Sequence, residues 1–236
     1  MDFNDYQQAI LDDISVQSSD AFYTTAVIKR AINRSYKWVC GLRNWPQTEE
    51  AYVRDTEVGK NYYNYPSNFK TDSIKRLKYN GDKYTKTVWS EFLNYQDENP
   101  TGTDKIFSDH KRQYHINATI SEVITDGISL WGHIGMPDDL VNSSDTTLFY
   151  GDQNIEEAIL KKALSILYKK GRGQMYDRGI ELEDDAKTLI ADAWSQIMKA
   201  QGDYQSKDGV VFNRIEVLPT RSQRRRTGRG NFNLTF

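Results

Sequence analysis

The chain has 236 residues and a formal net charge of −2, and its 38% hydrophobic and 27% charged residues are typical of a globular protein with one or two small domains. Its one cysteine, Cys40, excludes a disulfide framework within the chain, and no apolar run approaches the ~20 residues that a membrane-spanning helix needs. Because Met1–Asp5 lacks the basic and apolar regions of a signal peptide, we expect synthesis in a cytoplasm and no membrane partner.

Residues 1–46 are predicted to form the first part of a helical bundle. Apolar residues recur at helical spacing within 4–17 and, more regularly, within 20–42. Asp20 is placed to cap the second of these helices, and Pro46 prevents its continuation. We therefore expect two consecutive helices at the start of the chain.

The segment 47–150 has a different character, because the periodicity shortens and turn residues multiply. It is predicted to be a small β-rich domain inserted into the helical chain. Its clearest feature is Asn80-Gly81, a dipeptide that adopts the positive φ angles of a two-residue type I′ hairpin turn. The predicted elements are an extended run at Tyr62–Pro66, a hairpin at Ile74–Thr87, a short helix at Ser90–Tyr95, and two strands at Gln113–Thr125 and Gly127–His133 around Asp126-Gly127.

Helical periodicity returns in residues 151–202, the predicted second part of the bundle. Helices are expected over 155–170 and 182–200. The acidic residues at 181–185 would lie in the first turn of the last helix, where the helix dipole favours negative charge. Gly202 is expected to end that helix.

Together these segments predict a mainly α fold. Residues 4–42 and 155–201 are expected to pack as an antiparallel bundle of about four helices, from which a small inserted β domain projects. The remaining residues, 203–236, form an extended C-terminal arm. Beyond Pro219 the arm is rich in Arg, Gly and Asn, so we expect it to be disordered when alone.

Residue types that carry catalysis or hold metals do not form a recognisable constellation. His110 and His115 are five residues apart, which is not the spacing of a structural zinc motif. Cys40 lies within the helix predicted at 20–42 and is interpreted as a small buried apolar residue. The acids at 181–185 lack the spacing of a calcium-binding loop. We therefore expect no catalytic residue, no metal, no cofactor and no enzymatic activity.

The C-terminal arm is the most distinctive feature of the sequence. Residues 219–236 contain five of the 31 basic residues and no acid, which leaves 26 bases against 33 acids in the rest of the chain. Arginine binds carboxylates and phosphates through two parallel hydrogen bonds, so such a segment is typical of an interaction arm. Its candidate partner-binding residues are Arg221, Arg224, Arg225, Arg226, Arg229, Phe232, Leu234 and Phe236.

Three interpretations of the arm are open. In the first, the arm binds nucleic acid through phosphates, with Phe232 and Phe236 stacking on bases. In the second, it docks on an acidic protein groove, where its alternating apolar end enters a pocket or adds a strand to a sheet. In the third, it is a solvated terminus without a partner. The acidic body of the chain favours docking on a protein, because dedicated nucleic-acid binders usually present a basic domain.

Three stretches of the chain carry a resemblance to a known family. They are Ile28–Val39 followed by Asn44-Trp45-Pro46, then Tyr62–Phe69, and then Asp145–Ile159. In their order and spacing they resemble the head–tail connector, or adaptor, proteins of tailed bacteriophages. In that family a helix with an Asn-Arg centre leads through Trp-Pro into a β insertion, after which the chain returns to the helices.

The resemblance implies a structural virion protein at the head–tail interface. Its subunits would form a ring, usually a dodecamer, that binds the portal protein, continues the DNA channel and offers tail or tail-hub proteins an attachment surface. Genomic DNA would pass through without specific binding, and the extension at 203–236 would reach back to the portal. The alternatives are another neck, tail-completion or minor capsid structural protein, and a nucleic-acid-binding module that acts through the Arg-rich arm.

Overall fold

The computed structural model describes residues 1–14, 23–170 and 173–205, and it divides the chain into two compact units. The first unit, called the helical unit below, combines Met1–Val39 with Leu140–Phe236. The second, called the β unit, is Cys40–Asp139. The chain therefore leaves the helical unit, forms the whole β unit and then returns.

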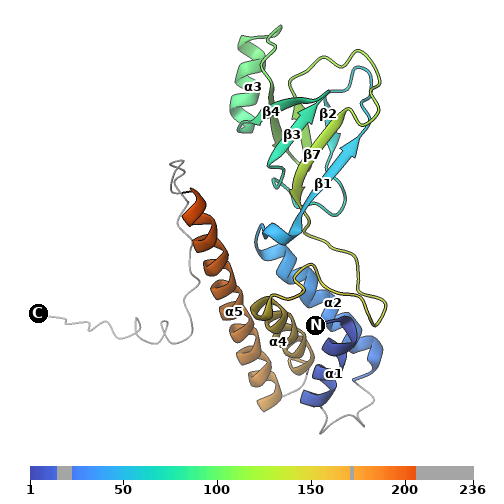
Figure 1. The fold of residues 1–236 in the computed structure, drawn as a ribbon, viewed down its shortest axis with the longest axis vertical. Helices are drawn as coiled ribbons and strands as arrows, with labels where there is room; N and C mark the ends of the chain where they lie inside the picture. Colours follow the sequence, from blue (N-terminus) through green and yellow to red (C-terminus); the bar gives the residue numbers. More distant parts are fainter. Residues whose placement is uncertain (15–22, 171–172, 206–236) are drawn as a thin grey trace, which may run out of the picture. The chain divides into compact units, whose positions relative to one another are not determined.

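Four of the described helices build the helical unit (Figure 1). They are α1 (Phe3–Ile14), α2 (Thr25–Leu42, whose last residues already belong to the β unit), α4 (Gln153–Tyr168) and α5 (Gln174–Gln205). The expected Asp20 cap of α2 lies outside the described residues. The start of α4 is capped by Asp152, whose carboxylate accepts a hydrogen bond from the Ile155 N–H at 3.3 Å.

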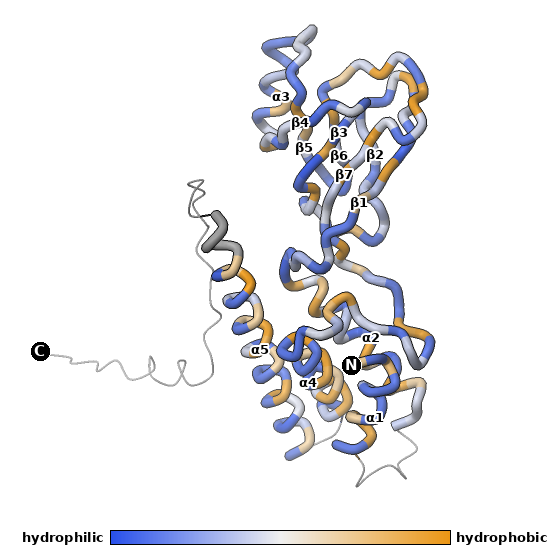
Figure 2. The backbone as a smooth tube through the Cα atoms, viewed as in Figure 1, coloured by the Kyte–Doolittle hydropathy of each residue, from blue (hydrophilic) through white to orange (hydrophobic). Residues whose placement is uncertain are grey.

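Apolar side chains at helical spacing form the core of the helical unit. Ile155, Ile159 and Ala163 are fully buried along one face of α4, and Leu182 and Ala186 are buried on α5. α4 packs along α5 and against α1, and hydrophobic and hydrophilic residues alternate within the turns of α4 and α5 (Figure 2). Each helix thus buries one stripe and exposes the other, and this packing supplies most of its stability.

α5 begins earlier and ends later than its sequence pattern predicts. It starts at Gln174, so the acids at 181–185 lie beyond its first turn, and the expectation that they cap the helix dipole is wrong. It also continues through Gly202. The early start depends on Gly179, where an added Cβ would lie 2.9 Å from the backbone nitrogen of Lys169. Without that glycine, the first turns of α5 would clash with the end of α4.

The β unit is a curled seven-stranded sheet with one helix, α3 (Trp89–Glu98) (Figure 1). The strand order is β1-β7-β3-β4-β5-β6-β2, and all neighbours are antiparallel except the parallel pair β4 and β5. A short 3-10 helix at Pro46–Thr48 precedes the sheet. The strands are β1 (Glu49–Arg54), β2 (Tyr62–Asn64), β3 (Arg76–Tyr79), β4 (Asp82–Lys86), β5 (Ile106–His110), β6 (Gln113–Ile116) and β7 (Ile128–His133).

The hairpin predicted around Asn80-Gly81 is confirmed. The two residues have φ angles of 47° and 82°, and the flanking residues Tyr79 and Asp82 pair across β3 and β4. The short helix expected at Ser90–Tyr95 is also present, as α3. Of the two strands expected around Asp126-Gly127, the second is present as β7, but the first is a strand only over Gln113–Ile116, so its predicted extent to Thr125 is wrong, and the two do not pair with each other. Instead β6 pairs with β2 and β5, and β7 pairs with β1 and β3.

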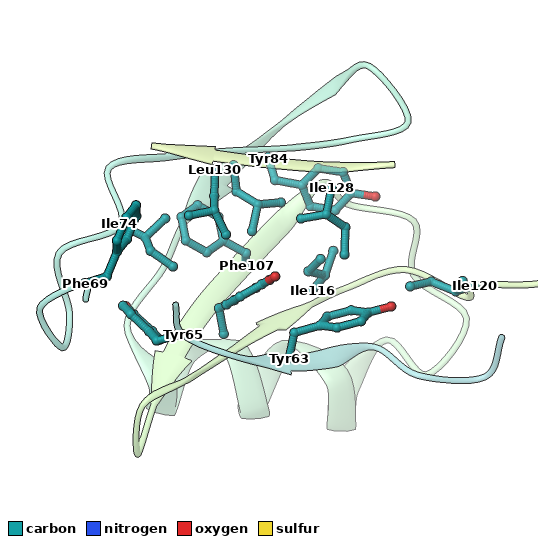
Figure 3. Packing of buried hydrophobic residues seen from close by; sticks show 12 residues of the cluster. Tyr63, Tyr65, Phe69, Ile74, Tyr84, Phe107, Ile116, Ile120, Ile128 and Leu130 are labelled. Atoms are coloured by element: carbon teal, nitrogen blue, oxygen red, sulfur yellow. The ribbon is translucent and has the colours of Figure 1, made fainter. Parts of the chain in front are cut away.

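The inner face of the curled sheet holds the core of the β unit (Figure 3). Tyr63 on β2 and Tyr114 on β6 stack with ring centroids 5.7 Å apart, and both are buried. Phe107 on β5 and Leu130 on β7 are fully buried in the same cluster. This core joins strands that are distant in sequence, so the β unit depends on long-range pairing.

The predicted fold class is wrong. The structure is not a mainly α four-helix bundle with a small β insertion, because five described helices are combined with a seven-stranded mixed sheet. The sequence pattern missed two strands. β1 is exposed on both faces, so its residues do not alternate in hydropathy. On β5 the adjacent Phe107 and Ser108 are both buried, which also removes the alternation.

Candidate functional site

The residues that the sequence singled out for partner binding lie outside the described part of the chain. The structure therefore does not test the arm, and its binding role stays a prediction. These residues are Arg221, Arg224, Arg225, Arg226, Arg229, Phe232, Leu234 and Phe236.

A different candidate site lies on the outer face of the sheet, over β7, β3 and β4. Arg76, Lys78, Lys83 and Trp131 line an open hollow of about 370 Å³, called the basic hollow below. Strand alternation places them together: core residues such as Leu77 point to the inner face, so their neighbours point outward. Arg76 pairs with Trp131 across β3 and β7, and Lys78 pairs with Lys83 across β3 and β4.

The cations of the basic hollow are not neutralised within the described chain. Arg76, Lys78 and Lys83 are exposed, and none forms an ion pair with a described carboxylate. The Lys78 Nζ lies 5.7 Å from the centre of the half-buried Trp131 ring, a cation–π contact. A small ligand needs a pocket that encloses most of its surface. This open, exposed hollow fits an acidic macromolecular surface better.

A second charged surface, called the acidic face below, lies on α3. Glu91, Asp97 and Glu98 are exposed there and have no ion pair with a described residue. The side chain of Leu93 lies on the same helix and is 41% exposed. The acidic face therefore combines negative charge with an apolar contact residue.

Aromatic packing holds α3 on the sheet. Phe92 is buried, and the Trp89 ring stacks on His110 of β5 with centroids 4.6 Å apart. The Trp89 ring also lies 4.6 Å from His115 of β6, and burial lowers the pKa of that histidine. The two histidines that we considered as metal ligands are thus brought together by a tryptophan. In the structure both histidines contact Trp89 and so help to hold α3 on the sheet.

Ionisable groups, some of them buried, connect segments of the β unit. Lys86 lies 2.6 Å from the carboxylate of Asp109 and 2.8 Å from that of Asp72. Burial raises the pKa of Asp109, although Lys86 opposes this effect. Burial also lowers the pKa of His133 to about 4, and its Nδ1 lies 3.2 Å from the Thr48 hydroxyl. Lys86 thus joins β4 to β5 and to the loop at Asp72, and His133 joins β7 to the 3-10 helix before β1, which is a structural role.

Cys40 is buried, as the sequence predicted, and burial raises the pKa of its thiol to about 12. A thiol with that pKa is protonated at neutral pH and is a poor nucleophile. Within residues 1–14, 23–170 and 173–205, no three His, Cys, Asp or Glu side chains form a metal-binding group. The expected lack of metal, cofactor and catalysis stays a prediction. None of the described helices is both long enough and apolar enough to cross a membrane.

Sequence reasoning missed both the basic hollow and the acidic face. The predicted hairpin already implied that Arg76 and Lys78 share one face, because residues two apart on a strand point to the same side. The pattern did not reveal that β7 lies beside β3, so the contribution of Trp131 was not predictable from local sequence. Comparison of the sequence with protein-family models and with curated proteins finds no match.

Proposed function

We propose that this protein is a structural subunit of a tailed phage that forms a ring between the portal and the tail and continues the DNA channel. The observation that carries the proposal is the order of its parts: a helical unit, interrupted by a complete β unit, resumed and followed by an Arg-rich arm. The sequence resemblance to head–tail connectors supports the same function.

The way the chain returns to the helical unit favours an adaptor. The segment after Leu140 is hydrogen-bonded to the first helices: the Phe3 N–H donates to the Asp145 carbonyl at 2.8 Å, and the Leu148 N–H donates to the Tyr36 hydroxyl at 3.0 Å. The two parts of the helical unit, before and after the inserted β unit, are thus hydrogen-bonded to each other. A helical unit joined in this way can bind one partner while the β unit binds another, as an adaptor between portal and tail requires.

The charge distribution also suits a subunit that surrounds DNA. Outside residues 219–236 the chain has more acids than bases, so its surface repels duplex DNA and lets it pass without specific binding. The arm carries the opposite charge. We propose that it binds the portal through Arg224, Arg225 and Arg226, and that its apolar end anchors in a portal pocket.

Co-sedimentation with the portal encoded in the same genome tests this function. The full chain should migrate with the portal, whereas a chain that lacks residues 219–236 should not. The truncated chain should keep the melting temperature of the full chain, since the deleted Arg-, Gly- and Asn-rich segment lacks the sustained apolar periodicity of a packed helix or strand. A full chain that sediments apart from the portal would overturn the portal–tail proposal and favour another neck, tail-completion or minor capsid role. A truncated chain that still binds would overturn the role of the arm alone.

One observation favours a second candidate function, nucleic-acid binding. The basic hollow combines a tryptophan with three cations that form no ion pair with a described carboxylate, and the arm adds further arginines. Fluorescence polarisation with labelled single-stranded and duplex DNA separates the two candidates. A nucleic-acid-binding module would bind at low salt and weaken by several powers of ten as salt rises, if it neutralises six or more phosphates. The connector function predicts negligible binding at physiological salt.

A further inference from the structure

We infer that the basic hollow of one copy receives the acidic face of α3 from the next copy, so that neighbouring β units bind head to tail. This inference rests on the proposed ring and deepens it by naming the surfaces that join the subunits. Each surface is exposed, and each lacks a partner for its charges within the described chain.

The first argument concerns the position of the two surfaces within the β unit. The basic hollow lies over β7, β3 and β4, whereas α3 packs over β5 and β6. They are different patches of one chain, and no ion pair among the described residues joins them. Two different complementary patches on one chain make a heterologous contact, which closes into a ring when the rotation between copies allows it.

The second argument concerns the chemistry of each surface. In the basic hollow, Trp131 supplies an apolar centre with cations around it. On the acidic face, Leu93 supplies an apolar side chain, Asp97 lies one turn further along the same helix, and Glu98 follows Asp97. Apolar anchors surrounded by charges are typical of specific interfaces, because the apolar centre supplies affinity and the charges set orientation.

The third argument favours a second copy over DNA as the occupant of the hollow. Residues 40–139 contain 12 Lys and Arg against 15 Asp and Glu, so the β unit that carries the hollow is acidic as a whole. Its long-range field therefore repels a polyanion such as DNA, although it can be complemented locally by a few carboxylates. A partner helix that exposes three acids and one leucine matches three cations beside one tryptophan.

Charge reversal in the full chain provides the test. One variant combines Lys78→Glu with Lys83→Glu, a second combines Asp97→Lys with Glu98→Lys, and a third carries all four changes. Matched controls are Lys111→Glu and Glu122→Lys, which reverse exposed charges elsewhere on the β unit that form no ion pair with a described residue. Because all six positions are exposed, we expect every variant to fold, and circular dichroism with a thermal melt verifies this for each one.

Two measurements are made on each variant: self-association of the chain alone by sedimentation velocity, and the number of copies bound per portal by mass photometry. Each double reversal should weaken association between copies by about a hundredfold, because like charges then face each other. The portal should accordingly carry isolated copies in place of a full ring. The fourfold variant should restore assembly, and both controls should behave like the unaltered chain.

The outcomes separate this contact from the proposed function. Full rings on the portal from both double variants would overturn the contact and leave the connector function intact. Charge-dependent assembly of the chain alone, with no portal binding, would support the contact and overturn the connector function. A chain that assembles neither alone nor on the portal would overturn both. Assembly as a two-fold dimer would also overturn the contact. So would duplex DNA binding at the hollow together with unchanged self-association of the variant that combines Lys78→Glu with Lys83→Glu.

Discussion

Asn33 and Leu140 form a reciprocal pair of hydrogen bonds across the base of the β unit's insertion. The Asn33 side-chain Nδ2 donates to the Leu140 carbonyl at 3.1 Å, and its Oδ1 accepts from the Leu140 N–H at 2.8 Å. Asn33 belongs to the Asn-Arg centre of α2, on which the sequence resemblance partly rests. The structure gives this asparagine a physical role, because it fixes the point where the chain returns to the helices.

We expect Asn33→Asp to lower the free energy of unfolding by about 1–3 kcal/mol. The carboxylate can still accept from the Leu140 N–H, but it cannot donate to the Leu140 carbonyl and would place two oxygens against each other. Urea unfolding measures the loss. Asn64→Asp is the matched control, because the Asn64 Oδ1 only accepts a bond from Gln113, at 3.1 Å. Equal stability of the two variants would contradict this role of Asn33.

The core of the helical unit predicts a clear ranking of truncations. Ile159 is fully buried on α4, so Ile159→Ala should cost about 2–5 kcal/mol of stability through the cavity it leaves. Trp38 is only half-buried, and its ring is covered by Lys162, whose Nζ lies 4.8 Å from the ring centre. Trp38→Ala should therefore cost less than Ile159→Ala. Val141, which is exposed, provides the control, and Val141→Ala should leave the thermal melt unchanged.

Glu183 on α5 makes the helical unit sensitive to acid. Burial would raise the pKa of this carboxyl, but hydrogen bonds from Lys169 and Lys162 outweigh burial and lower the pKa to about 2. A folded-state pKa below the ordinary 4.5 means that the charged group stabilises the fold above about 4.5. This stabilisation is lost as the pH falls from there toward about 2.

Glu183→Gln should therefore destabilise the protein by about 1–2 kcal/mol at neutral pH, after allowance for solvent screening. The difference from the unaltered chain should shrink as the pH falls below about 4.5. Urea unfolding across this pH range measures it. Glu157→Gln removes a weaker, more exposed ion pair to Lys161, at 3.8 Å, and should have little effect at any pH. If the free energy of unfolding of Glu183→Gln is lower than that of the unaltered chain by the same amount at every pH, the ion pairs of Glu183 are not the cause of the loss.

Two glycines should respond to alanine in opposite directions. Gly132 on β7 lies under Phe69, and an added Cβ would lie 2.8 Å from the Phe69 ring, so Gly132→Ala should destabilise the β unit by about 1–3 kcal/mol. Gly41 in α2 has open space around the position of a Cβ, so Gly41→Ala should stabilise the helix by roughly 0.5–1 kcal/mol. Melting temperatures measure both, and shifts in the same direction would contradict the packing described here.

Local sequence signals predicted the elements whose stability is local. The periodicity of α2 and α4 and the Asn80-Gly81 turn depend on residues a few positions apart, and all three are present. The sheet as a whole was not predictable, because its order places β7 between β1 and β3 and joins β4 to β5 in parallel. Such pairings depend on packing around a shared core, which leaves no periodic signal in β1 or β5.

The candidate surfaces were hidden for the same reason. Lys78 and Lys83 are close in sequence, but Trp131 joins them only through the pairing of β3 with β7. The sequence did predict α3, yet the exposure of Asp97 and Glu98 depends on which side of α3 packs on the sheet, and that is set by Phe92. The arm contains the residues that sequence reasoning favoured, and they lie outside the described part of the chain.

Negative-stain electron microscopy of the portal from the same genome, mixed with this protein, tests the central claim most directly. The connector function predicts a collar of added density on one end of the portal, coaxial with its channel. It also predicts that the collar disappears when residues 219–236 are removed. Portals that look identical with and without the full-length protein would contradict the claim that this chain joins a phage portal to its tail.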